Sequence, residues 1–154
     1  MLRSMITGPE IKTKDPYRKP EAVKELERMA DAEARRLHPA MPHLAPRKFR
    51  DDSANSLTGC IVKYITFKGG FASRISNQGT YSLKLRKYIP GTSRRGLPDI
   101  MATFRGISLH IEVKHGKDRL SDAQKEIRAE VSKSGGIYYV ARDFTSFKQW
   151  FDNL

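Results

Sequence analysis

Between Ile107 and Lys114 the side chains alternate without a break, apolar at each odd-numbered position and polar at each even-numbered one. Side chains two residues apart lie on the same face of a β-strand, so this alternation predicts a strand with one buried face. Glu112 and Lys114 then point together from the polar face. A chain with this pattern must build a sheet that carries charge on one side.

The residues before this strand predict a hairpin. Arg105-Gly106 can close a two-residue turn, which makes Phe104 the partner of Ile107. Counting outward along the ladder places Asp99 opposite Glu112, with the two Cβ atoms about 4.5 to 5.5 Å apart. Like charges at facing positions destabilise a sheet, so two carboxylates here need a compensating cation.

The carboxylate pair, Asp99 and Glu112, has the chemistry of a Mg²⁺ (or Mn²⁺) site. Mg²⁺ takes one or two carboxylates together with waters and phosphate oxygens, and the Val113 carbonyl offers a further oxygen ligand. Lys114 supplies one positive charge, and a divalent ion would supply the rest. The alternative interpretation is a surface salt-bridge cluster without a ligand.

Composition limits the class of protein. A chain of 154 residues, 38% hydrophobic and 30% charged, suits one domain with one core. No stretch is apolar enough to cross a bilayer, and residues 1–10 lack the apolar centre of a secretory signal, so no membrane contact is expected. Cys60 is the only cysteine, which excludes an internal disulfide and a cysteine-rich zinc site. The expected location is the cytoplasm.

Positive charge is concentrated in one part of the chain. The net charge is +12, and residues 53–98 contribute +8 because they contain eight basic residues and no acidic one. This block runs directly into Asp99, as expected for a DNA-binding surface that leads to a cleavage site. Tyr64, Phe71, Tyr81 and Tyr88 lie within the block, and each is a candidate for stacking on bases or for the core. The candidate phosphate contacts are Arg74, Lys84, Arg86, Lys87, Arg94, Arg95 and Lys117.

Residues 1–50 are expected to form a basic tail, a helix and a proline-rich linker before the main domain, residues 51–154. Little structure is expected up to Lys19. Residues 20–37 predict a helix, with acidic residues in its first turns and basic residues in its last. Its thin apolar stripe leaves two alternatives open: the helix docks on the main domain, or it is a separate arm that binds a protein partner.

The main domain is expected to begin with a helix over residues 53–68, although strand is a rival interpretation for residues 61–67. Two basic strands are expected over residues 71–77 and 81–88, separated by Gln78-Gly79 and followed by a loop over residues 90–97.

After Lys114 the pattern returns to a helix and a strand. Ser121 with Gln124 three residues later has the spacing of a capping box and predicts where the helix starts. The apolar run from Ile137 to Ala141 predicts a strand buried on both faces, parallel to its predecessor across the helix. A last helix is expected after Asp143.

The order of these elements, with Pro98-Asp99 followed after twelve residues by Glu112-Val113-Lys114, resembles the PD-(D/E)XK nucleases. Within that group, residues 96–100, 111–114 and 120–124 resemble the VRR-NUC branch. The resemblance covers about residues 53–154. It implies an α/β restriction-endonuclease-like core, a central mixed β-sheet flanked by helices in the order α-β-β-β-α-β-α, with an N-terminal helical appendage.

The resemblance also implies roles for single residues. Asp99, Glu112 and the Val113 carbonyl would bind the metal, Lys114 would position or activate the attacking water, and Gln124 would be a further polar residue beside the site. The capping box explains Gln124 equally well, so both explanations stay open.

Many relatives carry another acidic ligand on the first helix. Residues 53–98 contain no acidic residue, so a second tightly held metal would depend on Asp51 or Asp52. His110 lies on the polar face of its strand, and a structural role is expected for it rather than a phosphate contact.

The expected function is a Mg²⁺-dependent DNA endonuclease, directed by DNA structure and acting in phage or bacterial DNA processing, recombination or repair. Lysine has a reference pKa near ~10.4, so Lys114 is expected to orient the nucleophile and stabilise negative charge instead of acting as a base. Two alternatives stay open. One is a Holliday-junction resolvase acting as a homodimer with two dyad-related sites, and the other is a non-catalytic basic nucleic-acid-binding module on the same fold.

Overall fold

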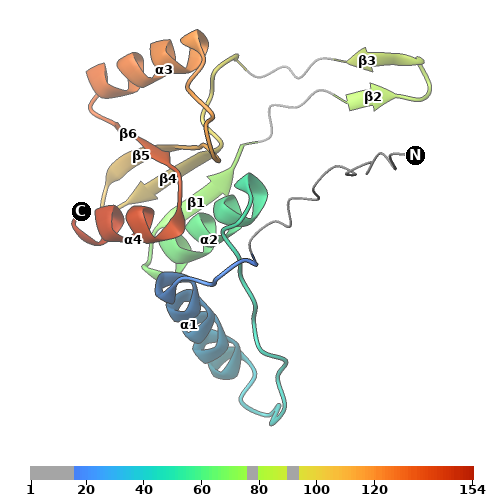
Figure 1. Cartoon of the computed structure of the whole chain (residues 1–154), viewed down its shortest axis with the longest axis vertical. Coiled ribbons are helices and arrows are strands. Elements are labelled where there is room, and N and C mark those ends of the chain that lie inside the picture. Colours follow the sequence, from blue (N-terminus) through green and yellow to red (C-terminus); the bar gives the residue numbers. More distant parts are fainter. Residues whose placement is uncertain (1–15, 76–79, 90–93) are drawn as a thin grey trace, which may run out of the picture.

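The computed structural model describes residues 16–75, 80–89 and 94–154, which form a mixed α/β structure (Figure 1). The helices of these residues are α1 (Glu21–Leu37), α2 (Ala54–Phe67), α3 (Asp122–Lys133) and α4 (Phe144–Asp152). The strands are β1 (Phe71–Arg74), β2 (Thr80–Ser82), β3 (Lys87–Ile89), β4 (Ile100–Phe104), β5 (Ile107–Val113) and β6 (Ile137–Ala141). The expectations for residues 1–15, for Gln78-Gly79 and for the start of the loop at residues 90–93 lie outside the described residues.

Four of the strands form one mixed sheet in the order β1-β4-β5-β6. β4 is antiparallel to both β1 and β5, and β6 is parallel to β5, as the strand, helix, strand pattern predicted. From α2 onward, the elements that belong to this sheet or flank it are one helix, three strands, a helix, a strand and a last helix, in the predicted order; β2 and β3, which the prediction did not include, come between the first two of these strands.

The predicted hairpin between β4 and β5 is confirmed. Phe104 pairs with Ile107, and both turn residues have positive φ, 49° at Arg105 and 78° at Gly106. Positive φ at both positions is the type I′ conformation, one of the two that match the twist of the strands a two-residue turn joins. The turn therefore fixes the register of the whole ladder back to the pair Ile100 and Ile111.

One face of the four-stranded sheet forms one side of the hydrophobic core. Ile100, Ala102, Leu109 and Ile111 point into it and are buried, as the alternation predicted. α2 and α4 cover this face, while α3 lies on the other side of the sheet (Figure 1). The rival strand interpretation for residues 61–67 is wrong, because those residues continue α2 and bury its apolar side in the same core.

α1 docks on the main domain through its apolar stripe. Val23 and Leu26 are fully buried and belong to the same core as α2 and α4. The segment just before the helix is also held, which the sequence did not predict. The Tyr17 hydroxyl donates a 2.7 Å hydrogen bond to Asp51, and Lys19 forms a 2.5 Å ion pair with Glu27.

The prediction of a single basic strand over residues 81–88 is wrong. This region forms a separate two-stranded antiparallel ribbon, β2 and β3, joined by a turn at residues 83–86. We call residues 80–89 the β2–β3 ribbon. It lies away from the four-stranded sheet (Figure 1), and its strands pair with each other rather than with the sheet.

Candidate metal centre

The candidate site lies where β4 begins and β5 ends, on the sheet face opposite the hydrophobic core. Asp99 directly precedes Ile100, whose ladder partner is Ile111, so the next step outward brings Asp99 level with Glu112. Asp99 also bonds across this gap, because its Oδ2 accepts a 2.8 Å hydrogen bond from the Val113 N–H. The structure therefore brings the carboxylate pair together, as the register predicted.

Glu112 is the most enclosed polar group of the site, with only 3% of its surface exposed. Its Oε1 accepts hydrogen bonds from Lys114 Nζ at 2.9 Å and from Gln124 Nε2 at 2.5 Å. Its Oε2 is buried and has no hydrogen-bond partner among the described residues. Both donors contact Oε1, so Oε2 is the oxygen of Glu112 that is left to bind a cation.

The electrostatics of Glu112 show that its charge is undercompensated. Burial raises the pKa of this carboxyl, the contact with Lys114 lowers it, and the nearby charge of Asp99 raises it again, with a net increase. One ammonium group does not offset two adjacent carboxylates in a buried place. A divalent cation beside Oε2 would remove this imbalance.

Lys114 follows the last residue of β5 and points to the same face as Glu112, as the alternation predicted. Its backbone N–H donates a 2.9 Å hydrogen bond to the Ala141 carbonyl, which extends the parallel ladder with β6. Its side chain is 14% exposed. Because both its backbone and its ammonium group are held, Lys114 has a fixed position beside the carboxylate pair.

Gln124 is both a helix cap and a neighbour of Glu112. Its Oε1 accepts a 2.9 Å hydrogen bond from the Ser121 N–H, and Ser121 Oγ accepts one from the Gln124 N–H, which completes a capping box. The other end of the same amide donates to Glu112. The two explanations that the sequence left open are therefore compatible.

A close backbone contact holds the loop before Asp99 against this helix. Gly96 has φ +82°, and a Cβ built on it would lie 2.5 Å from the backbone of Ala123, at the start of α3. No side chain fits in that space, so glycine at this position lets the loop approach the helix that carries Gln124.

Tyr138 is a site neighbour that the sequence analysis missed. It is the β6 partner of His110, and its hydroxyl is buried without a partner among the described residues. Burial, followed by the charges of Glu112 and Asp99, raises the pKa of its phenol. The apolar run over residues 137–141 predicted the strand but not its register against β5, which is what places this ring near the carboxylates.

His110 has a mainly structural environment. Its Nε2 lies 3.1 Å from Ser108 Oγ, and its Nδ1 is buried without a partner among the described residues. Burial lowers the pKa of the imidazole and so favours its neutral form.

Asp51 and Asp52 do not supply a further acidic ligand. Asp51 accepts hydrogen bonds from the Tyr17 hydroxyl at 2.7 Å and from the Phe144 N–H at 3.3 Å, and Asp52 pairs with Arg50. In the part of the chain that the structure describes, no three His, Cys, Asp or Glu side chains gather as a metal-binding group. The candidate site is therefore a two-carboxylate site.

The donors that are present fit a hard divalent cation such as Mg²⁺ or Mn²⁺. Glu112 offers an orphaned buried oxygen, and Asp99 has one oxygen outside its bond to Val113. The N–H and C=O of one strand residue point to the same edge, so the Val113 carbonyl also lies on the Asp99 side of β5. These three oxygens leave room for waters and phosphate oxygens, as Mg²⁺ sites require.

The candidate phosphate contacts lie on several different elements. Lys84, Arg86 and Lys87 lie on the β2–β3 ribbon, and Arg95 and Lys117 are exposed in loops on either side of the carboxylate pair in the sequence. Two are engaged within the chain: Arg74 donates a 2.6 Å hydrogen bond to Asn55, and Arg94 forms a two-pronged pair with Glu130 at 2.8 and 2.6 Å.

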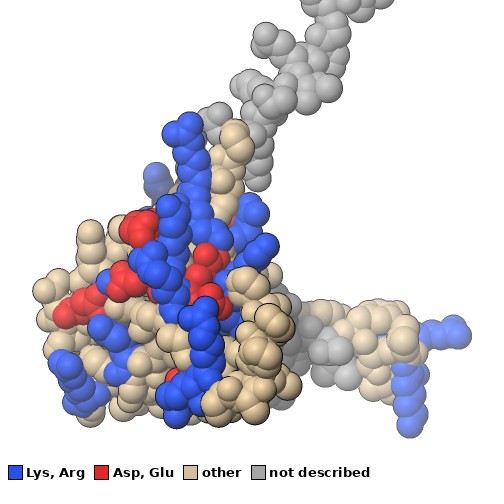
Figure 2. All heavy atoms as spheres, turned by 90° about the horizontal axis from the view of Figure 1, so that it is seen from below, with Lys and Arg blue, Asp and Glu red and all other residues tan. Residues whose placement is uncertain are grey.

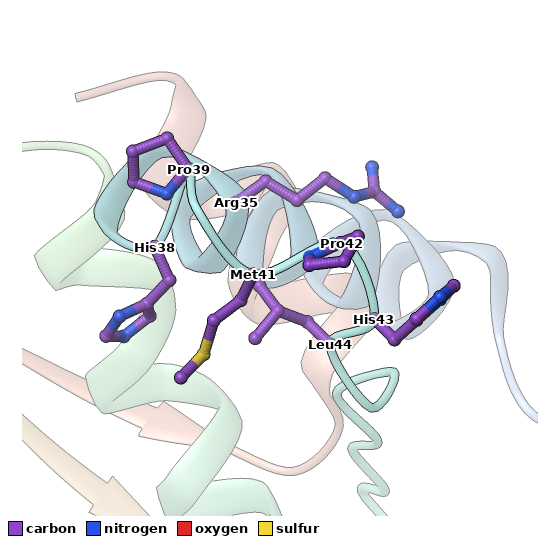
Figure 3. A pocket seen from close by; sticks show the side chains of 7 residues that line it. All are labelled: Arg35, His38, Pro39, Met41, Pro42, His43 and Leu44. Carbon is purple, nitrogen blue, oxygen red and sulfur yellow. The ribbon is translucent and has the colours of Figure 1, made fainter.

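A separate hollow of about 420 Å³ lies after α1, in the proline-rich segment (Figure 3). It is lined by Arg35, His38, Pro39, Met41, Pro42, His43 and Leu44. None of these side chains is acidic, so the hollow lacks the carboxylates that the site on β4 and β5 provides.

No family model, curated protein or solved structure matches this chain. Among residues 16–75, 80–89 and 94–154, no helix has both the length and the apolar character needed to cross a membrane.

Proposed function

We propose that the chain is a divalent-metal-dependent DNA endonuclease of the PD-(D/E)XK type, in the VRR-NUC branch, acting in DNA processing, recombination or repair. The observation that carries this proposal is Glu112, a buried carboxylate across from Asp99 whose Oε2 is left without a donor. The placement of Lys114 beside it and of Gln124 on the next helix supports a restriction-endonuclease-like core.

Asp99, Glu112 and the Val113 carbonyl would hold Mg²⁺ or Mn²⁺. When bound, such an ion supplies positive charge that acidifies water and offsets negative charge on the scissile phosphate. The surface salt-bridge interpretation fits less well, because Glu112 is 3% exposed and an isolated surface cluster would leave both its oxygens to solvent.

Hydrolysis forms a bond between a water oxygen and phosphorus and breaks the bond from phosphorus to one sugar oxygen. The proton that the water loses is balanced by the one that the leaving oxygen gains. Lys114 donates hydrogen bonds but, as an ammonium group, has no lone pair for that proton. Its role is to orient the nucleophile and to stabilise the negative charge that grows on the phosphate oxygens.

Replacing Asp99 tests the proposal directly. Wild-type protein should cut duplex, single-stranded, flap or four-way DNA in Mg²⁺ or Mn²⁺ and should stop in EDTA, while Asp99→Ala should bind DNA but not cut it. Asp99→Asn keeps an acceptor for the Val113 N–H, so it separates lost charge from lost structure. Asp122→Asn, an acid 93% exposed at the start of α3, is the matched control and should cut normally.

Undiminished cutting by Asp99→Ala, or cutting that persists in EDTA, would refute the assignment. Binding without any cutting by the wild-type protein across all four substrates would instead identify a non-catalytic nucleic-acid-binding module.

A further inference from the structure

The β2–β3 ribbon presents a pair of aromatic rings to solvent. Tyr81 and Tyr88 are facing partners in its ladder and are 56% and 60% exposed. Side chains at facing positions leave a ribbon on the same face, about 4.5 to 5.5 Å apart at Cβ. The two rings therefore form one exposed aromatic surface.

The rest of the ribbon is basic and apolar. Lys84, Arg86 and Lys87 are exposed, and no acidic residue occurs between residues 53 and 98. Figure 2 shows the ribbon extending from the body with Lys and Arg side chains but no Asp or Glu, whereas both signs are mixed on the body. Leu83 and Leu85 in the turn are 85% and 55% exposed. So much apolar surface on ten residues marks a contact site.

The chain leaves for the ribbon, and returns from it, beside the carboxylate pair. On the outward side the Ile75 N–H donates a 2.8 Å hydrogen bond to the Asp99 carbonyl. On the return side Arg94 pairs with Glu130 on α3, and Gly96 packs against the start of the same helix. The described residues on both sides of the ribbon are therefore held near the candidate metal centre.

We propose that the ribbon binds single-stranded DNA, with Tyr81 and Tyr88 stacking on unpaired bases and its three cations contacting phosphates. Cations select a polyanion, and exposed aromatic rings select one with flat apolar faces. The identity of the polymer rests on the proposed function, and the ribbon narrows the substrate to DNA that has unpaired bases near the bond that is cut.

A second copy of the chain suits this surface less well. Two ribbons packed together would set the three cations of one against the three of the other with no acidic residue between them. Like charges placed face to face across an interface oppose association.

The test compares the binding of two fluorescent strands in EDTA, where no metal-dependent cutting occurs. One strand is oligo(dT), and the other is an abasic strand of the same length with the same phosphates but no bases. Wild-type protein should prefer oligo(dT) by about tenfold or more, since stacking on an aromatic ring contributes about 1–3 kcal/mol per base. The double variant Tyr81→Ile, Tyr88→Ile should lose this preference and still bind the abasic strand.

Isoleucine favours strands, so this variant keeps the ribbon while removing the rings. Tyr81→Phe, Tyr88→Phe should restore the preference, because phenylalanine keeps the stacking face. Leu37→Ala removes an apolar side chain that is 57% exposed at the end of α1, outside the ribbon, and should leave the preference unchanged. Replacing Lys84, Arg86 and Lys87 with alanine should weaken the binding of oligo(dT) and of the abasic DNA strand equally.

An unchanged preference for oligo(dT) in the isoleucine variant would overturn the proposal. So would light scattering that shows a wild-type dimer broken by the isoleucine substitutions with DNA affinity unaltered, since the ribbon would then bind a second copy. Because binding is measured without metal, loss of the proposed nuclease activity and loss of this base preference are separate results.

Discussion

Gln124 shows how one side chain links the helix that follows β5 to the carboxylate pair. Its carbonyl oxygen caps α3 and its amide nitrogen donates to Glu112. An amide can do this because it carries an acceptor and two donors on opposite branches. The cap fixes the rotamer of Gln124, and the fixed rotamer places the donor on Oε1 of Glu112. The hydrogen bond that Gln124 donates to Glu112 thus depends on the cap at the start of α3.

Two substitutions separate the cap from the site. Ser121→Ala removes the capping oxygen and should cost about 1 kcal/mol of stability without loss of cleavage. Gln124→Ala should lower stability similarly, but it should also reduce the proposed metal-dependent cleavage by about 10- to 100-fold, as expected when a hydrogen bond to the proposed metal ligand Glu112 is lost. Urea unfolding and initial cleavage rates measure the two effects. Equal cleavage by both variants would show that Gln124 acts only as a cap.

Residue-level prediction succeeded where the information was local. The alternation over residues 107–114 and the Arg105-Gly106 turn fix the facing of Asp99 and Glu112, because a strand has period two and a two-residue turn fixes register. Tyr138 could not be found this way. Its place beside the carboxylates depends on how β6 pairs with β5 across a whole helix, and no local pattern carries that register.

At the scale of elements, the turn inside the β2–β3 ribbon explains why one strand was predicted there. Residues 83–86 contain no Gly, Pro, Asn or Asp, the residues that usually mark a turn. Arg86 nevertheless has φ +48°, a conformation that glycine and asparagine adopt more readily than arginine. Leu and basic residues alternate through this turn with the period of a strand, so the sequence predicts one continuous strand instead of a hairpin.

α1 illustrates a different limit of sequence analysis. Its apolar stripe is correctly predicted, but the surface on which the stripe packs is not. A thin apolar face is compatible with docking on the main domain or on another protein. In the structure the stripe closes the core between α2 and α4. The helix is thus a structural part of the same unit as the sheet.

Leu26→Ala measures this docking. The side chain is fully buried, so the substitution should cost about 2–5 kcal/mol in urea unfolding and should keep a single transition. Leu37→Ala, at the end of the same helix and 57% exposed, should change stability by less than about 0.5 kcal/mol. If both substitutions had the same small effect, the helix would be a separate arm rather than part of the core.

At the scale of the whole molecule, a network of polar side chains around Asp152 connects three helices. Asp152 at the end of α4 accepts a 2.6 Å hydrogen bond from the Tyr64 hydroxyl of α2 and pairs with Lys68 at 3.1 Å and Lys148 at 2.9 Å. Lys148 also pairs with Glu25 of α1 at 3.2 Å. Tyr64 and Asp152 are 88 residues apart in the chain, so this network could not be predicted from any local motif.

Acid should therefore weaken the docking of these helices. Burial opposes ionisation of Asp152, but hydrogen bonds from Tyr64, Lys148 and Lys68 outweigh it and lower its pKa from 3.8 to about 2. A carboxyl with a lowered folded-state pKa stabilises the fold above its unfolded pKa, and this contribution disappears as the pH falls through the folded pKa. For Asp152 the loss should fall between about pH 4 and pH 2, with a size of about 1–2 kcal/mol.

The comparison of wild type with Asp152→Asn isolates this group from the other acids. The variant should be less stable by about 1–2 kcal/mol near neutral pH, and the difference should vanish below about pH 2, where the aspartic acid is protonated and as uncharged as the amide. Asp122→Asn should show little change at any pH, because solvent screens its ion pair with Lys125. Urea unfolding followed by tryptophan fluorescence reports the difference, since Trp150 lies on α4. A stability difference that stays constant from neutral to acid pH would mean that packing, not the charge of Asp152, holds the three helices together.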